Sequence, residues 1–245
     1  MNILVFQHSD LGHAGRLADT LGGRGIKLDV RRADLFGQDA ARGVPASLDG
    51  IDGVIMMGGA GFVTDAPSTP WMQWQGGFIR LAHEAGLPVV GVCLGAQMIG
   101  QVLGGVVGFK ETPAAGMHQA SLTLAGQLDV AFSGIAWEHP QFFSCSQEVK
   151  QLPPGATLLA SAPGTVNAAF RVGSSTYAFQ SHPESHRPML DSLVSESASA
   201  FSKAGISPET AAAQIARDYA LYDRVGWRLM ENLAAFIFRS AAARR

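Results

Sequence analysis

The stretch Leu87–Gly105, LPVVGVCLGAQMIGQVLGG, decides the fold. It opens with β-branched apolar residues, reaches a cysteine, Cys93, that stands two positions from Gly91 and from Gly95, and continues with helical spacing. This order predicts a buried strand, a sharp turn and a helix, because glycine lets a strand and a helix approach without a Cβ clash. Cys93 then projects from the carboxyl end of the sheet, in the geometry of a nucleophile elbow that carries sulfur.

Two interpretations of Cys93 are open on this stretch alone. Free cysteines are most often small, buried and apolar in behaviour, so Cys93 can be a packing residue. The start of the following helix, however, supplies free backbone N–H groups and a positive dipole end, which favour both a thiolate and a developing oxyanion. A second motif is needed to decide between the two.

Strand and helix patterns alternate through the first part of the chain. The expected elements are strands at Asn2–Phe6, Lys27–Arg31 and Gly53–Met57 and helices at Gly12–Gly22 and Trp71–Ala85. This alternation predicts an α/β fold with a doubly wound, mostly parallel sheet and helices on both faces. Ligands of such sheets bind beyond the carboxyl ends of the strands, so we expect the glycine-rich loop Gly58–Gly61 to lie beside Cys93.

After Gly105 the pattern changes to short strands separated by turns, and then to helices. The expected antiparallel additions are Val106–Phe109, Ser121–Leu124, Leu128–Phe132, Phe142–Cys145, Thr157–Ser161 and Ala168–Val172, followed by Thr176–Gln180. We predict one domain over residues 1–240, in which residues 187–240 form a helical extension with a helix start at Ser207-Pro208-Glu209. An apolar stripe on the last helix (Leu221, Val225, Leu229, Leu233, Phe236) is expected to dock on the domain.

Composition excludes several classes of function. The 245 residues carry a net charge of −2, which gives no electrostatic case for a nucleic-acid partner. The two cysteines form no disulfide framework and no metal-type spacing, so we assign no metal and no cofactor and expect a reducing cytoplasm. Residues Leu87–Phe109 lack charge, but their glutamines and glycines fit a covered parallel sheet better than a membrane span.

The second motif is Ser181-His182-Pro183-Glu184, directly after the expected strand Thr176–Gln180. His182 and Glu184 are two residues apart at a strand end, so their side chains can point the same way. A cysteine nucleophile needs a base, and the base needs a group that fixes its tautomer; Cys93, His182 and Glu184 can fill these roles. The alternative is an ordinary His–Glu pair in a surface loop.

Both motifs together resemble a known family. Gly91-Val92-Cys93-Leu94-Gly95-Ala96-Gln97 and Gln180-Ser181-His182-Pro183-Glu184 are similar to the G-x-C-x-G-x-Q and H-P-E signatures of the class I glutamine amidotransferase family, in its stand-alone, GMP-synthase-like branch. The loop Met56-Met57-Gly58-Gly59 resembles the glycine-rich oxyanion strand of that family. The resemblance implies a flavodoxin-like fold.

The resemblance also implies residue roles. Cys93 would be the nucleophile, His182 the general base and acid, Glu184 its orienting carboxylate, Gly59 and Leu94 the oxyanion-hole donors, and Gly58 and Gln97 substrate-binding residues. The implied reaction converts glutamine to glutamate and ammonia through a γ-glutamyl thioester. The oxyanion hole is expected to make the largest contribution to stabilisation of the transition state, at roughly 3–4 kcal/mol per donor.

Three functional hypotheses follow for a chain with a small-molecule γ-glutamyl substrate. It can be the glutaminase half of a two-subunit synthase that passes ammonia to a partner subunit. It can be a free-standing hydrolase of γ-glutamyl peptides or amines. It can also be a catalytically silent binding module, because a fold alone does not decide function.

Overall fold

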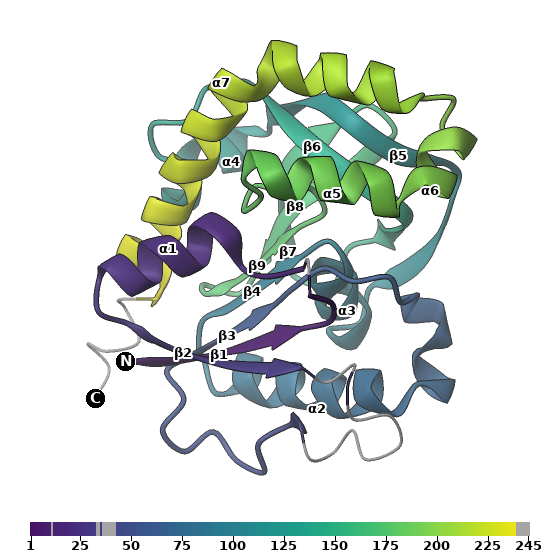
Figure 1. Cartoon of the computed structure of the whole chain (residues 1–245). Coiled ribbons are helices and arrows are strands. Elements are labelled where there is room, and N and C mark those ends of the chain that lie inside the picture. Colours follow the sequence, from purple (N-terminus) through teal and green to yellow (C-terminus); the bar gives the residue numbers. More distant parts are fainter. Residues whose placement is uncertain (11, 33–34, 36–42, 239–245) are drawn as a thin grey trace.

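The computed structural model describes residues 1–10, 12–32, 35 and 43–238. Within these residues, nine strands form one sheet in the order β2-β1-β3-β4-β9-β8-β7-β5-β6 (Figure 1). The first five strands in that order are parallel: β2 (Lys27–Arg32), β1 (Asn2–Gln7), β3 (Gly53–Met56), β4 (Val89–Val92) and β9 (Thr176–Phe179). The predicted α/β class with a mostly parallel, doubly wound sheet is confirmed.

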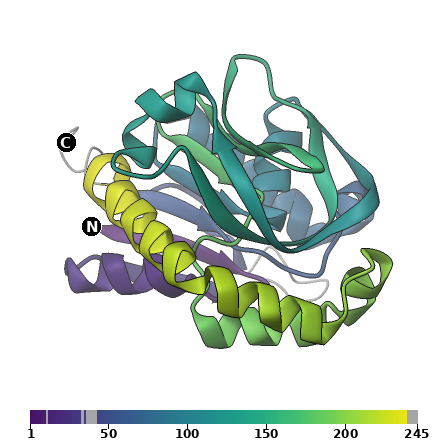
Figure 2. The ribbon, with the colours of Figure 1, turned by 90° about the horizontal axis from the view of Figure 1, so that it is seen from above.

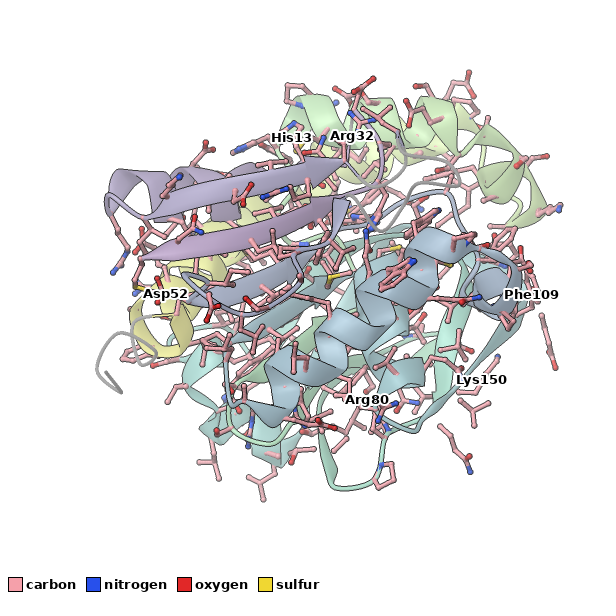
Figure 3. All side chains as sticks on the ribbon, turned by 90° about the horizontal axis from the view of Figure 1, so that it is seen from below. His13, Arg32, Asp52, Arg80, Phe109 and Lys150 are labelled. Atoms are coloured by element: carbon pink, nitrogen blue, oxygen red, sulfur yellow. The ribbon has the colours of Figure 1, made fainter. Side chains whose placement is uncertain are left out.

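Strands β1, β3, β4 and β9 are covered on both faces, as their apolar runs predict, whereas the edge strand β2 is half-exposed. Ile3 and Val5 of β1 belong to a core with α1 (Gly15–Gly23) and α7 (Pro208–Asn232). Leu4 and Phe6 face the other way, into a core with α2 (Pro70–Glu84) and α3 (Leu94–Val102). Figure 3 shows α2 lying across this second face. The alternation follows from the period of two in a strand, and it leaves the carboxyl ends of the strands free to form a site.

The antiparallel strands are longer than predicted. The expected strand Val106–Phe109 and the first half of the expected strand Ser121–Leu124 are two parts of one strand, β5 (Val106–Leu122), whereas Thr123 and Leu124 begin a helix. The expected strand Phe142–Cys145 is the middle of β6 (Glu138–Gln151). The polar residues after Phe109 resemble a loop, but an irregularity in the register between Phe109 and Ala114 accommodates them while β6 continues alongside. β7 (Ala156–Ala162) and β8 (Thr165–Val172) complete this half of the sheet.

The predicted strand Leu128–Phe132 is wrong. The segment contains the end of helix α4 (Leu124–Leu128) and a 3-10 turn, η4 (Val130–Phe132). Two side-chain caps explain the difference: Thr123 Oγ1 accepts a bond from the Gly126 backbone N–H at 3.0 Å, and Asp129 Oδ1 accepts one from that of Ala131 at 2.9 Å. Such local bonds outweigh the β propensity of a short apolar run.

The C-terminal segment is helical, as predicted, and crosses the top of the sheet (Figure 2). It comprises α5 (Arg187–Glu196), α6 (Ala198–Lys203), α7 and a π-helical end, η5 (Leu233–Phe238). The Ser207 hydroxyl accepts a bond from the Thr210 N–H at 3.2 Å, which caps α7 at the predicted start. Of the predicted stripe, Val225, Leu229 and Leu233 are buried, whereas Leu221 and Phe236 are exposed.

A short 3-10 helix, η3 (Val63–Ser68), joins the glycine-rich loop to α2. None of the described helices combines the length and the apolar character that crossing a bilayer requires. The uncharged stretch after Leu87 instead forms β4, α3 and the start of β5.

Candidate active site

Cys93 lies between β4 and α3 with φ of 49° and ψ of −104°, and among the described residues it is the one non-glycine residue with a positive φ. This strained conformation costs on the order of 1–3 kcal/mol, so the surrounding packing has to enforce it. The nearby glycines do so: a Cβ at Gly95 would lie 2.1 Å from the Met56 carbonyl oxygen, and one at Gly91 would lie 2.7 Å from the Gly95 carbonyl. The predicted strand–turn–helix elbow is therefore present.

His182 and Glu184 follow β9, the strand that pairs with β4 in the sheet. Both are buried, and His182 Nδ1 lies 3.0 Å from Glu184 Oε1. Gly58 lies next to both the His182 ring and the Cys93 side chain. A Cβ built at Gly58 would lie 3.1 Å from His182 Cε1 and 3.6 Å from Cys93 Cβ, so the imidazole and the cysteine are close to each other. The three side chains predicted to act together are thus brought together, from segments 89 residues apart in the chain.

The charges of this group favour a protonated imidazole. Burial lowers the pKa of His182, but the Glu184 carboxylate, followed by the charge and hydrogen bond of Cys93, outweighs burial and raises that pKa to about 10. An imidazolium beside a cysteine is the environment in which a thiolate is stabilised. Burial acts in the opposite sense on the second cysteine, where it raises the pKa of the Cys145 thiol far above its usual value.

A cleft opens at Cys93 and consists of two adjoining hollows of about 140 and 210 Å³. The first hollow reaches Gly58, His182 and Glu184, and the second reaches Leu94 and Gln97. The residues that line both are Gly59, Ala60, Cys93, Ser144, Glu196 and Ser197. All seven residues singled out from the sequence therefore line the cleft, while their individual roles stay predictions.

The predicted oxyanion donors have suitable surroundings. Leu94 is the first residue of α3, so its backbone N–H has no acceptor within the helix. Gly59 has no room for a side chain, because a Cβ there would lie 2.7 Å from His8 Cβ. The His8 ring lies with Nδ1 3.1 Å from the Met57 carbonyl oxygen and 3.3 Å from that of Gly58. His8 therefore contacts the backbone of the glycine-rich loop and helps to hold it in place.

Gln97 is held in place by its own hydrogen bonds. Its side-chain N–H₂ donates to the Gln147 carbonyl oxygen at 2.8 Å and lies 3.3 Å from Gln180 Oε1. The amide is buried and forms part of the wall of the second hollow. The protein thus supplies partners for this amide nitrogen without a ligand.

Two parts of the site were missed in the sequence. His8 follows the first strand directly, and the rule that ligands bind at carboxyl strand ends would have pointed to it. Glu196 and Ser197 reach the cleft from the junction of α5 and α6. Their approach depends on how the C-terminal helices pack, which no local pattern encodes.

Fold and cleft together define an α/β protein with a polar site at the carboxyl ends of its parallel strands. A family model described as "Glutamine amidotransferase class-I" matches residues 10–196, and the chain belongs to this family. The glutamine-hydrolyzing GMP synthase of Christiangramia forsetii is 33% identical over 144 residues, which are 58% of this chain and 26% of that protein. The corresponding enzyme of Mycolicibacterium paratuberculosis is 35% identical over 135 residues, 54% of this chain and 25% of that protein. The matched region thus spans about a quarter of these curated relatives.

Solved structures support the same fold. A glutamine amido transferase from Methylobacillus flagellatus superposes with a TM-score of 0.82 at 24% identity, covering 98% of this chain and 94% of that one. A glutamine amidotransferase from Thermotoga maritima gives a TM-score of 0.80 at 18% identity, covering 96% and 98% of the two chains. At these identities the likeness establishes the architecture alone.

Proposed function

We propose that the protein hydrolyses the γ-glutamyl amide bond of glutamine, with Cys93 as nucleophile, His182 as general acid and base, and Glu184 as the carboxylate that orients His182. The observation that supports this most strongly is a strained cysteine, beside a buried His–Glu pair with a 3.0 Å contact, at the mouth of a cleft. Membership of the class I glutamine amidotransferase family supports the choice of an amide substrate.

In the proposed reaction the Cys93 thiolate attacks the amide carbon. The carbonyl oxygen takes up the negative charge and accepts hydrogen bonds from the N–H groups of Gly59 and Leu94, which act as the oxyanion hole. The His182 imidazolium gives its proton to the leaving nitrogen, so that ammonia departs and a γ-glutamyl thioester remains. Water then attacks the thioester while neutral His182 takes up its proton, and glutamate leaves as the thiolate forms again.

We infer that opposite sides of the substrate occupy the two hollows. We place the γ-glutamyl group in the hollow that contains Leu94 and Gln97. Gln97 then binds the substrate from that hollow, and Gly58 binds it from the adjoining one. The leaving nitrogen then lies toward His182, in the other hollow. Among the described residues that line the cleft there is no lysine or arginine, and Glu196 is the one acid besides Glu184. Glu196 thus suits the α-ammonium group of a substrate.

The test is the release of ammonia from glutamine by the wild-type protein and by Cys93→Ala. We expect activity in the wild type and its loss in the variant, by a factor of about 10³ or more, because the nucleophile is gone. Cys145→Ala is the matched control and should keep most of the activity. Cys145 also lines the second hollow, but its side chain is buried in β6, and burial raises the pKa of its thiol above the usual value. An electrophilic γ-glutamyl analogue should label Cys93 and spare Cys145. Equal labelling, or equal ammonia release by Cys93→Ala, contradicts the proposal.

A second candidate is a hydrolase of γ-glutamyl peptides or amines. The observation that favours it is the size of the cleft, which continues on both sides of Cys93 and leaves space for a leaving group larger than ammonia. Faster release of an amine from a γ-glutamyl peptide than of ammonia from glutamine would select this function over the first. Absence of turnover on both substrates would indicate a silent binding module.

We also propose the wider setting of the activity. The names of the relatives suggest a synthase subunit as acceptor of the ammonia. A reducing cytoplasm suits a free, reactive thiol at Cys93. We propose that the helical residues from 187 onward belong to the same domain as the site, because they line the cleft and pack on the sheet.

A further inference from the structure

The turn that carries His182 and Glu184 is held by its backbone as well as by the His–Glu contact. The four consecutive carbonyl oxygens from His182 to Ser185 all lie against two residues that are distant in sequence, Arg16 of α1 and Tyr222 of α7. Neither residue belongs to the two motifs, around Cys93 and His182, that the sequence analysis singled out. Both side chains are fully buried.

Arg16 contacts three of these carbonyl groups. Its backbone N–H donates to the Glu184 oxygen at 2.9 Å, and one guanidinium nitrogen donates to the oxygens of Pro183 at 3.1 Å and Ser185 at 2.6 Å. This nitrogen carries two N–H bonds and can donate one to each oxygen, which leaves the other nitrogen of the planar fork free for a further acceptor. The second guanidinium nitrogen contacts Asp223 of α7 at 2.6 Å, so the arginine is tied to the same helix as Tyr222.

Tyr222 contacts the two ends of the turn. Its hydroxyl lies within hydrogen-bond distance of the carbonyl oxygens of His182 and Ser185 and donates its single proton to one of them at a time. Burial, together with the Glu184 charge, raises the pKa of Tyr222 far above its ordinary value, so the hydroxyl stays a donor. The Arg16 guanidinium lies over the Tyr222 ring, 5.0 Å from its centroid, which joins the two residues into one unit.

Helix α7 approaches the turn as closely as its backbone allows. A Cβ at Gly226 would lie 2.7 Å from the Pro183 carbonyl oxygen and 2.9 Å from the Arg16 guanidinium. Helix α7 passes along both α1 and α5 (Figure 2), and its contacts with these two helices fix its position. The family match ends at residue 196, so α7 lies outside it.

We propose that α7 is a positioning element for the active site, in which Tyr222, together with Arg16, fixes the backbone of the turn and thereby the imidazole of His182 relative to Cys93. This inference rests on the proposed function for the role of His182. Tyr222 and Arg16 touch no reacting atom and are positioning residues. Their effect is on the chemical step, because a displacement of the base by about 1 Å can cost on the order of a hundredfold in rate.

The test compares Tyr222→Phe with Tyr219→Phe in the full chain. Tyr219 is the matched control, because its hydroxyl lies on the same helix but accepts from the Arg187 N–H at 3.1 Å and does not contact the turn. At a temperature where both variants are folded, we expect kcat for glutamine hydrolysis to fall by about tenfold or more in Tyr222→Phe, with KM changed by less than about twofold. Tyr219→Phe should keep both constants.

A second measurement does not depend on turnover. We expect the pKa of His182, measured by NMR of its ring, to fall below about 10 in Tyr222→Phe, because the ring moves relative to Glu184. In Tyr219→Phe the pKa of His182 should not change. Loss of thermal stability with unchanged kcat and unchanged His182 titration would overturn the positioning role. A wild-type protein that lacks hydrolytic activity would refute the proposed function, whereas the His182 titration would still decide the role of α7.

Discussion

The two sides of the proposed active site are built in different ways. The cysteine side is local: Cys93 takes its strained conformation from glycines two residues away on either side, within one strand–turn–helix unit. The histidine side is long-range: the turn after β9 is held by Arg16 and Tyr222, which lie 166 and 40 residues from His182. A local device can be recognised in a short stretch of sequence, whereas a long-range one depends on the assembled fold.

The largest expected effect concerns the local side. Gly95→Ala should destabilise the protein by several kcal/mol, about 3 or more, because the new methyl group would lie 2.1 Å from the Met56 carbonyl oxygen, which belongs to the sheet. The measurement is chemical unfolding together with activity.

Gly77→Ala is the control for Gly95→Ala, since Gly77 also lies in a helix and a Cβ there meets nothing within 4 Å. It should stabilise the protein by about 0.5–1 kcal/mol, because alanine favours a helix. Similar stability changes in the two variants would show that the close approach at Gly95 does not enforce the elbow.

The same contrast explains which parts of the molecule could be predicted from the sequence. Strands β1, β3, β4 and β9 are short apolar runs with clear ends, and β2 alternates between apolar and polar residues. Both patterns are recognisable in the sequence, and the predicted bounds agree with the observed ones to within about two residues. β5 and β6 were predicted only in part. The residues 110–113 interrupt the apolar pattern of β5, and they lie in the register irregularity between Phe109 and Ala114. The strand expected at Leu128–Phe132 is wrong because the capping bonds of Thr123 and Asp129 favour helical turns there, and a short apolar run does not reveal them.

The residues of the candidate site also differ in whether a short stretch of sequence reveals them. The residues singled out from motifs all line the cleft, since each motif directly follows a parallel strand. The supporting residues were not found, because Arg16 and Tyr222 have no pattern around them that distinguishes them from ordinary helix residues. Their function becomes visible only when α1 and α7 are seen against the same turn.

The second largest expected effect concerns Glu184, the carboxylate that contacts His182 on the histidine side of the site. Glu184→Gln keeps a side-chain oxygen that can accept from His182 Nδ1 but removes the negative charge. That charge is the largest of the causes that raise the pKa of His182, so the pKa should fall below about 10 and the ring should lose its proton at a lower pH.

Glutamine hydrolysis by Glu184→Gln should fall by about a hundredfold, because the imidazolium that donates to the leaving nitrogen is less stabilised. NMR titration of the ring and a pH profile of kcat test both parts. A His182 pKa that stays at about 10 in this variant would show that the carboxylate charge does not control the base.

The smallest expected effect separates the stability of α7 from its contact with the turn. Ser207→Ala removes the cap that accepts from the Thr210 N–H, 15 residues before Tyr222, and should lower the free energy of unfolding by about 1 kcal/mol. The helix remains folded at 25 °C after so small a loss, and Tyr222 remains on the turn, so kcat should not change. Denaturant unfolding and steady-state kinetics measure the two quantities. If kcat fell in Ser207→Ala as far as in Tyr222→Phe, the helix would act through its overall folding, and the specific contact of the Tyr222 hydroxyl with the turn would not be the reason for its effect.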